Sequence, residues 1–304
     1  MSNLANVGNI VRTLQSVNSN VTEDGQLCLL SLEGDRLIEN IYDNEELLSQ
    51  RCVTNDAKHN SSAVYMMLES SAFMLYLGSN ASLCAREFNH GEKEWVEAKI
   101  EIPHLTDLCP ETRLSVVTVP EVTIVFYQTI KGQVHGIAFD RKKEHWLAPF
   151  CLPCQAQRGT PISAFSTQES VIVSFVDIEK KVHIFSRRLE ADKWEDKILD
   201  DSSDNAHMMN LVVYENEERG TIEAFAQVQN KILHIDQHQG RSCLGQVTKG
   251  EFTPITKAEC GRFIRARFGM LGRLRGNTNI TINSNNNSGY APISVWGARR
   301  PAWA

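Results

Sequence analysis

The chain has 304 residues, with 31 Lys and Arg against 37 Asp and Glu, which gives a net charge of −6. This length is sufficient to bury a large hydrophobic core, and the charges form no long run of one sign that would favour nucleic acid or a membrane surface as a partner. No stretch approaches the about 18 uninterrupted apolar residues of a membrane span, and the N-terminal segment lacks the apolar centre of a signal peptide. We therefore expect a cytoplasmic protein without a nucleic-acid or membrane partner.

Short apolar runs separated by turn residues recur along the chain with a period of about 50 residues, which is typical of repeat folds. Each unit has about four runs with alternating or continuous apolar character, and this pattern indicates strands rather than helices. In the third unit the runs read LSVVTV, VTIVFYQ, QVHGIAF and HWLAPFCL. The units span residues 9–53, 63–100, 114–152, 162–199, 209–247 and 262–304, and the last is the least regular.

Six units of four antiparallel strands predict an all-β protein, a single six-bladed β-propeller domain over residues 1–304. Stacking the blades around an axis buries both faces of each sheet and leaves only short edges. A long solenoid is the alternative, but the period is too long for β-helix coils and the sequence too β-rich for helical repeats. Trp95, Trp146 and Trp194 recur at 51 and 48 residues, either as wedges between blades or as rings that stack on a ligand.

Eight cysteines are scattered along the chain, and without a secretion signal we expect them to be free thiols. Cys151 and Cys154 form a lone CxxC pair. A structural zinc site needs a second pair of ligands at matching spacing, and none follows. We therefore expect no metal and, in the absence of any nucleotide-binding or zinc-protease motif, no cofactor.

Three histidines recur after Val or Leu near the start of the third run, at His135, His183 and His234. Equivalent positions in successive blades lie far apart, so the three cannot share one ion. We interpret these histidines as packing residues that hydrogen-bond to the backbone.

The segment VTIVFYQTIKGQVHGIAFDRKKEHW, residues 122–146, carries the most specific motif. FYQ ends an apolar strand, GQV opens the next strand, Asp140 stands at the following turn, and Trp146 comes after it. This arrangement resembles the fungal fucose-specific lectin family of six-bladed propellers, and the matching spacing covers roughly residues 9–297. The resemblance implies the propeller fold.

In that lectin family an Arg on the second strand and a later Glu hold the sugar hydroxyls, while an aromatic ring from the next blade covers the apolar face of the sugar. The corresponding pairs here, twelve residues apart, are Leu27 and Glu39, Phe73 and Ala85, Ile124 and Gly136, Ile172 and Ile184, and Glu223 and Ile235. Only Glu39 keeps the family's residue. Each missing buried partner costs about 1 to 3 kcal/mol, so the sequence predicts that the fold is kept and fucose binding is lost.

The resemblance also implies a second kind of function, because related fungal propellers are associated with natural-product pathways and some promote hetero-Diels–Alder reactions. A cofactor-free cyclase or pericyclase would hold a small hydrophobic metabolite in a central apolar pocket and polarise a carbonyl with one or two donors. The alternatives are a carbohydrate-binding propeller with a glycan ligand and a protein-interaction propeller. A homodimer is a further expectation.

The candidate site residues are polar, aromatic or flexible side chains, most of them on the innermost runs. The expected catalytic groups are Tyr65, Arg113, His135 and Arg265. The expected substrate-binding residues are Arg12, Met67, Trp95, Trp146, Tyr214 and Arg267. For the residues of the innermost runs, ordinary polarity at strand ends is the alternative interpretation. The arginine-rich segment at residues 261–276 is either solvated and salt-bridged or a site for an anionic ligand.

Overall fold

The computed structural model describes residues 16–21, 26–43, 46–68, 71–216, 219–238, 240–248 and 251–254. Within these ranges the chain forms five antiparallel sheets and one short 3-10 helix, η1 (Ser203–His207). The protein is therefore all-β. No helix of the described residues has the length and hydropathy needed to cross a membrane.

Each sheet is formed by consecutive strands. Sheet one contains β1 (Asn18–Val21), β2 (Leu27–Glu33), β3 (Arg36–Asp43) and β4 (Glu46–Thr54). Sheet two contains β5 (Ala63–Met67), β6 (Ala72–Leu77), β7 (Leu83–Asn89) and β8 (Glu94–Glu97). Sheet three contains β9 (Ser115–Thr118), β10 (Val122–Gln128), β11 (Gln133–Asp140), β12 (His145–Trp146) and β13 (Phe150–Gln155). Sheet four contains β14 (Ser163–Ser166), β15 (Ser170–Val176), β16 (Val182–Arg188) and β17 (Glu195–Asp200). Sheet five contains β18 (Met208–Asn216), β19 (Thr221–Val228), β20 (Lys231–Asp236), β21 (Gly240–Thr248) and β22 (Glu251–Pro254).

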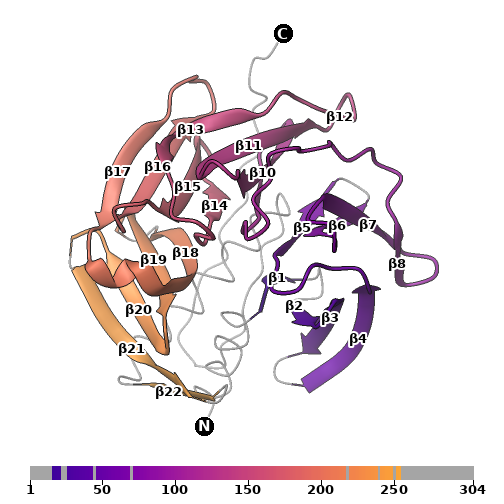
Figure 1. Ribbon diagram of the computed structural model, residues 1–304, viewed down its shortest axis with the longest axis horizontal. Coiled ribbons are helices and arrows are strands. Elements are labelled where there is room, and N and C mark those ends of the chain that lie inside the picture. Colours follow the sequence, from indigo (N-terminus) through magenta and orange to yellow (C-terminus); the bar gives the residue numbers. More distant parts are fainter. Residues whose placement is uncertain are drawn as a thin grey trace, which may run out of the picture.

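The five sheets follow one another around a common centre in chain order, from indigo to orange (Figure 1). The first strand of each sheet lies innermost, and the later strands lie toward the rim. This arrangement confirms the β-propeller, and we number its blades one to five in chain order. The sixth predicted blade, residues 262–304, lies outside the described residues.

Within the described residues, the observed strands differ from the predicted runs at two places. In blade three the predicted fourth run is split into β12 and β13, which both pair with β11. Pro149 lies in the break between them, where a residue without a backbone N–H cannot continue the ladder. Blade five has the additional strand β22. Most of the run predicted from residue 9 in blade one lies outside the described residues, where β1 is the first strand that the structure describes.

The hydrophobic core is divided among the interfaces between blades. Each apolar cluster contains residues from two neighbouring blades: Leu30 and Val53 of blade one, for example, pack with Met74 and Tyr76 of blade two. Equivalent clusters join blade two to three, three to four, and four to five. One blade buries its faces only against its neighbours, which is the physical reason for the ring.

Serine hydroxyls at the start of the innermost strands link successive blades. Each hydroxyl accepts a hydrogen bond from a backbone N–H on the innermost strand of the next blade, or next to it. The pairs are Ser62 with Leu114 at 2.9 Å, Ser115 with Ala164 at 2.9 Å, and Ser163 with Val213 at 3.0 Å. These bonds fix the height of each blade relative to the one before it.

Replacing Ser163 by Ala should lower the free energy of unfolding by about 1 to 3 kcal/mol, because the buried N–H of Val213 would lose its acceptor. The measurement is the midpoint of urea unfolding. Ser79→Ala, in an exposed turn, is the control and should change stability by no more than about 0.5 kcal/mol. Equal midpoints for Ser163→Ala and the wild type would contradict the linking role.

The Gln of the FYQ motif also links two blades. Gln128 is fully buried, and its Nε2 donates to the backbone oxygen of Gln157 at 2.9 Å. Its Oε1 accepts from the backbone N–H of Gly159 at 2.8 Å. The side chain thus ties the end of β10 to the segment that leads into blade four. The FYQ motif therefore has a structural role in joining two blades, and it does not indicate an activity.

Candidate functional site

A buried carboxylate lies between blades one and two and accepts hydrogen bonds from three side chains. Glu39 on β3 is 4% exposed. Its Oε1 accepts from the Tyr65 hydroxyl at 3.0 Å, and its Oε2 accepts from the Trp95 indole N–H at 3.1 Å and from Arg51 Nη1 at 3.4 Å. We call these four residues the Glu39 cluster.

The strands of the two blades place the members of the Glu39 cluster. Arg51 on β4 stands directly opposite Glu39 in the register of β3 with β4. Tyr65 and Trp95 come from β5 and β8 of the next blade. Phe88 supports the guanidinium, since the Arg51 Cζ lies 5.1 Å from the centre of the Phe88 ring. The Arg51 side chain is 29% exposed, so this edge of the cluster reaches the surface.

The electrostatics of the cluster favour hydrogen bonding over proton transfer. Burial, together with the charge of Glu39, raises the pKa of Tyr65 well above its usual range, so its hydroxyl stays protonated and donates. The guanidinium of Arg51 balances the charge of the carboxylate. An arrangement of this kind binds hydroxyl groups, because a carboxylate accepts from them and guanidinium and indole groups donate to them.

The interface between blades three and four has lost this arrangement. Gly136 occupies the position of Glu39, and Phe150 stands opposite it as Arg51 stands opposite Glu39. A Cβ on Gly136 would lie only 2.3 Å from Cζ of Phe150, so the ring fills the place of a larger side chain. No carboxylate can enter here without displacing this ring.

Arg187 supplies the cation of this interface from the other side. Its Cζ lies 5.5 Å from the ring centre of Phe150 and 5.1 Å from that of Trp194. Arg187 precedes Trp194 by seven residues, just as Phe88 precedes Trp95. Compared with blades one and two, the guanidinium and the phenyl ring have therefore exchanged strands.

At the two other described interfaces no carboxylate occupies the position of Glu39, although Asp200 of blade four pairs elsewhere with Arg241 of blade five at 2.8 Å. Between blades two and three, Ala85 packs in the apolar cluster together with Trp146, whose indole N–H donates to the backbone oxygen of Glu101 at 2.7 Å. Between blades four and five, Ile184 is buried in an apolar cluster with Ile235. The three repeated tryptophans all pack between blades, as the wedge interpretation predicts.

The expected catalytic residues that the structure describes are not brought together. Tyr65 bonds to Glu39, whereas Arg113 donates to the backbone oxygen of Ser61 at 3.4 Å, and burial lowers its pKa. His135 lies against the Tyr127 ring at 5.8 Å, and burial lowers its pKa as well. Among the described residues no hydrogen bond, ion pair or ring contact joins Tyr65, Arg113 and His135. Met67 lies on β5, and Arg12, Arg265 and Arg267 lie outside the described residues.

Tyr214 belongs to a second polar cluster, within blade five. Its hydroxyl donates to Oε2 of Glu223 at 2.6 Å. Asn216 Nδ2 lies 2.6 Å from Oε1 of this carboxylate and His234 Nε2 lies 2.7 Å from its Oε2. Burial alone would raise the pKa of Glu223, but these hydrogen bonds and the charge of His234 lower it overall. This carboxylate is 2% exposed, and its partners saturate it.

The recurring histidines bond to carboxylates in two blades, so the expectation of backbone partners is wrong for them. His234 contacts Glu223, and His183 contacts two aspartates. Each of the three histidines stands opposite an aromatic residue on the preceding strand, and the pairs are His135 with Tyr127, His183 with Phe175, and His234 with Phe225. The repeat is therefore an aromatic–histidine pair that packs within the blade.

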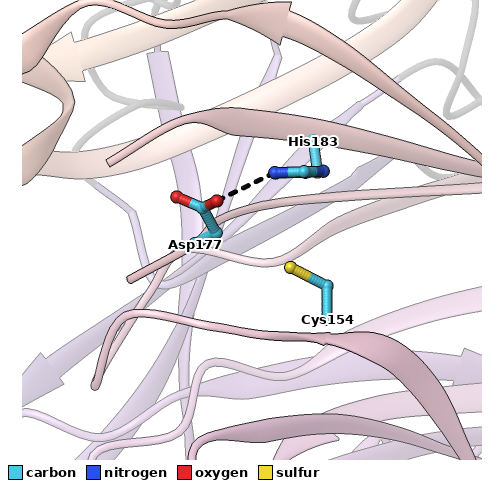
Figure 2. Close-up of side chains that lie close together, drawn as sticks. All are labelled: Cys154, Asp177 and His183. Atoms are coloured by element: carbon cyan, nitrogen blue, oxygen red, sulfur yellow. Dashed lines mark hydrogen bonds and ion pairs between the residues drawn. The ribbon is translucent and has the colours of Figure 1, made fainter. Parts of the chain in front are cut away.

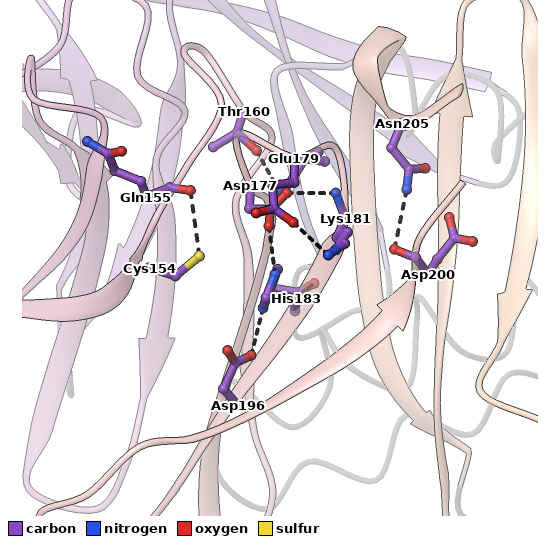
Figure 3. Close-up of polar contacts among 12 residues, drawn as sticks. Cys154, Gln155, Thr160, Asp177, Glu179, Lys181, His183, Asp196, Asp200 and Asn205 are labelled. Atoms are coloured by element: carbon purple, nitrogen blue, oxygen red, sulfur yellow. Dashed lines mark hydrogen bonds and ion pairs between the residues drawn. The ribbon is translucent and has the colours of Figure 1, made fainter. Parts of the chain in front are cut away.

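The two contacts of His183 use both ring nitrogens (Figure 3). Nε2 lies 2.9 Å from Oδ2 of Asp177, and Nδ1 lies 2.7 Å from Oδ1 of Asp196. Cys154, on β13 of blade three, approaches the same group. Burial, with the charges of Asp177, Asp196 and Glu179, raises the pKa of the Cys154 thiol to about 11.

Sequence reasoning missed Arg51 because it searched for the cation on the second strand. Leu27, the residue tested there, pairs with Tyr42 at the other end of the hairpin and not with Glu39. At the first interface Glu39 therefore has a guanidinium partner, which comes from the following strand and not from the position of Leu27. A search of the predicted strand that follows Glu39 would have found a cation directly opposite it.

Comparison with known proteins supports the fold. Neither a protein-family model nor a curated protein matches the sequence. Among solved structures, a triple arginine-to-alanine mutant of AofleA from Arthrobotrys oligospora is 18% identical, with a TM-score of 0.58 over 78% of this chain and 74% of that one. SapL1 lectin in complex with alpha methyl fucoside is 10% identical, with a TM-score of 0.55 over 75% and 79%. The six-bladed lectin of Aleuria aurantia is 15% identical, with a TM-score of 0.53 over 78% of each chain. The chain therefore has the fold of the fungal fucose-lectin-like β-propellers.

Proposed function

We propose that this protein is a carbohydrate-binding propeller that uses the Glu39 cluster between blades one and two. The observation that carries the proposal is the convergence of Arg51 and Trp95 on one buried carboxylate from two neighbouring blades. The similar folds include a lectin in complex with alpha methyl fucoside, so a terminal fucose is the first ligand to test.

A sugar hydroxyl binds at the exposed edge of the cluster, beside Arg51. The contact of Arg51 Nη1 with Glu39 Oε2 is the longest of the three at 3.4 Å. A hydroxyl at this edge accepts from the guanidinium and donates to the carboxylate, and both bonds are charge-assisted. The partly exposed Phe88 ring, 5.3 Å from the buried Trp95 ring, offers apolar surface for the C–H groups of a sugar.

Carbohydrate binding is favoured over the cofactor-free cyclase because, among the described residues, the groups expected to polarise a metabolite do not meet. Tyr65 is engaged by Glu39, and Arg113 and His135 have other surroundings. The four interfaces between described blades contain one Glu39 cluster, so we expect one site among them. The seven cysteines within the described residues are free thiols.

The test is binding of α-methyl fucoside by titration calorimetry, together with a glycan array. Glu39→Gln and Arg51→Leu should each weaken binding about tenfold or more, because each removes a charge-assisted hydrogen bond worth about 1.5 to 3 kcal/mol. Arg187→Leu is the matched control, since this arginine also lies over an aromatic ring but has no carboxylate opposite it. Its affinity should equal that of the wild type.

Thermal unfolding of each variant shows whether the fold is kept. A folded wild-type protein that binds neither α-methyl fucoside nor any glycan of the array would refute the proposal. So would a bound glycan whose affinity is unchanged in both Glu39→Gln and Arg51→Leu.

A further inference from the structure

Three side chains with different metal-binding atoms lie close together between blades three and four, away from the Glu39 cluster. Sγ of Cys154, a carboxylate oxygen of Asp177 and a ring nitrogen of His183 all lie within 4.8 Å of one another. Figure 2 shows the sulfur, the carboxylate and the imidazole turned toward a common point. Cys154 comes from β13, Asp177 directly follows β15, and His183 comes from β16.

The chain around the three groups already restrains their positions. Asp177 closes the turn between β15 and β16, where its Oδ1 accepts from the backbone N–H of Lys181 at 2.7 Å. The His183 ring stacks on Phe185 at 5.7 Å with an angle of 13° between the planes. Both side chains are buried. The carboxylate and the imidazole are thus held before any ligand arrives, which is what a metal site requires.

A fourth residue supplies the outer partner that metal-binding histidines usually have. Asp196 on β17 lies 2.7 Å from Nδ1 of His183, on the side of the ring away from Asp177. A carboxylate there keeps the proton on Nδ1, so that Nε2 presents its lone pair to a cation. The Asp196 side chain is 42% exposed, so this edge of the group is open to solvent.

A bound cation favours the deprotonated form of the Cys154 thiol. The only hydrogen bond of Cys154 Sγ within the described residues is a long one, 3.6 Å to the backbone oxygen of Gln155. Asp177 and Asp196 make the surroundings negative, and Lys181 is engaged by Glu179 at 2.6 Å. A divalent cation reverses this repulsion and stabilises the thiolate.

We propose that Cys154, Asp177 and His183 bind a zinc ion, with Asp196 orienting the histidine. One sulfur, one nitrogen and one carboxylate oxygen form a ligand set that zinc accepts, with a fourth position left for water. Zinc–sulfur and zinc–nitrogen bonds of about 2.3 and 2.0 Å place ligand atoms about 3.5 Å apart. Nε2 of His183 and Oδ2 of Asp177 are already 2.9 Å apart, so the main change needed is an approach of the sulfur by about 1 Å. On binding, the thiol gives up its proton to solvent.

This proposal departs from the expectation of no metal. The CxxC pair is not the ligand pair, because Cys151 stands opposite His135 in the register of β11 with β13. The partners of Cys154 come from the next blade instead, and no spacing rule within one blade would find them.

The test uses the full-length protein, stripped with a chelator and titrated with Co²⁺. We expect a thiolate-to-cobalt absorption that saturates at one ion per chain and that added Zn²⁺ abolishes. Cys154→Ser should remove this absorption, and Asp196→Asn should weaken Co²⁺ binding about 10- to 100-fold. Cys151→Ser is the matched control, because Cys151 lies three residues before Cys154 on the same strand. This variant should titrate as the wild type does.

Circular dichroism and thermal unfolding without metal verify that each variant is folded. The absence of any thiolate-to-cobalt absorption in the wild type would overturn the proposal. An absorption that persists in folded Cys154→Ser would overturn it too, since the thiolate would then come from another cysteine. In either case His183 serves only as an ion-paired packing residue.

Discussion

Replacing Gly136 by Glu should destabilise the propeller by about 3 to 5 kcal/mol. The new side chain would meet the Phe150 ring, which lies 2.3 Å from the place of a Cβ, and would bring a carboxylate into an apolar interface. Gly136 has an ordinary strand conformation, so the cost arises from the ring and the charge and not from the backbone. Urea unfolding followed by tryptophan fluorescence measures the loss.

The double substitution Gly136→Glu with Phe150→Arg is the decisive companion. It rebuilds at this interface the pair formed by Glu39 and Arg51, since the two positions face each other in the same register. Phe150→Arg alone brings a second guanidinium beside Arg187 and should destabilise as well. We expect the double variant to be more stable than Gly136→Glu alone, with a coupling energy of at least about 1 kcal/mol. Additive losses would contradict the view that Phe150 occupies the carboxylate's place.

Replacing Glu223 by Gln should lower the free energy of unfolding at neutral pH by about 3 kcal/mol. The carboxylate accepts from Tyr214, Asn216 and His234, and an amide would direct its NH₂ group toward one of these donors. Removing one member of a buried charged network leaves the others without their partner. Thermal and urea unfolding measure the effect.

The same substitution should change the dependence of stability on pH. The pKa of Glu223 is lowered in the folded protein, so its contribution is complete above the unfolded value of about 4.3 and is lost as the pH falls through the lower folded value. The stability difference between wild type and Glu223→Gln should therefore shrink on acidification below about pH 4. Glu121→Gln, at an exposed ion pair with Lys142, is the control and should show no such trend. A difference that stays constant down to pH 2 would show that the charge of Glu223 contributes nothing.

Much of the propeller could be predicted from the sequence because its signals are local. Apolar runs such as VTIVFYQ give the strands, and turn residues give their ends, so β10 was located to the residue. The split between β12 and β13 was missed, since Pro149 stands within an otherwise continuous run. The repeat also indicated that Trp146 and Trp194 lie between blades, because a large ring at a fixed position in each unit favours the same environment.

The candidate sites were harder to predict because their members meet across strands and blades. Glu39 could be recognised by its position in the repeat. Arg51 can be recognised as its partner only when the register of β3 with β4 is known. Cys154 was judged by its neighbour Cys151, whereas its contacts come from Asp177 and His183 in the next blade. Periodicity gives the direction of a side chain from its own strand, and it does not give the side chain that faces it across an interface.

The exchange of guanidinium and phenyl ring between interfaces has a consequence for assembly. Blades of one chain share a shape, so a folding propeller is exposed to docking of the wrong pair. If blade four packed on the face of blade one that blade two normally covers, Arg187 would meet Arg51, a residue of like charge. If blade two packed in the same way on blade three, Phe88 would meet Phe150 without any cation. Each of these two interfaces thus accepts its own neighbouring blade more readily than the other blade. The exchanged positions of guanidinium and phenyl ring therefore favour the correct order of these blades.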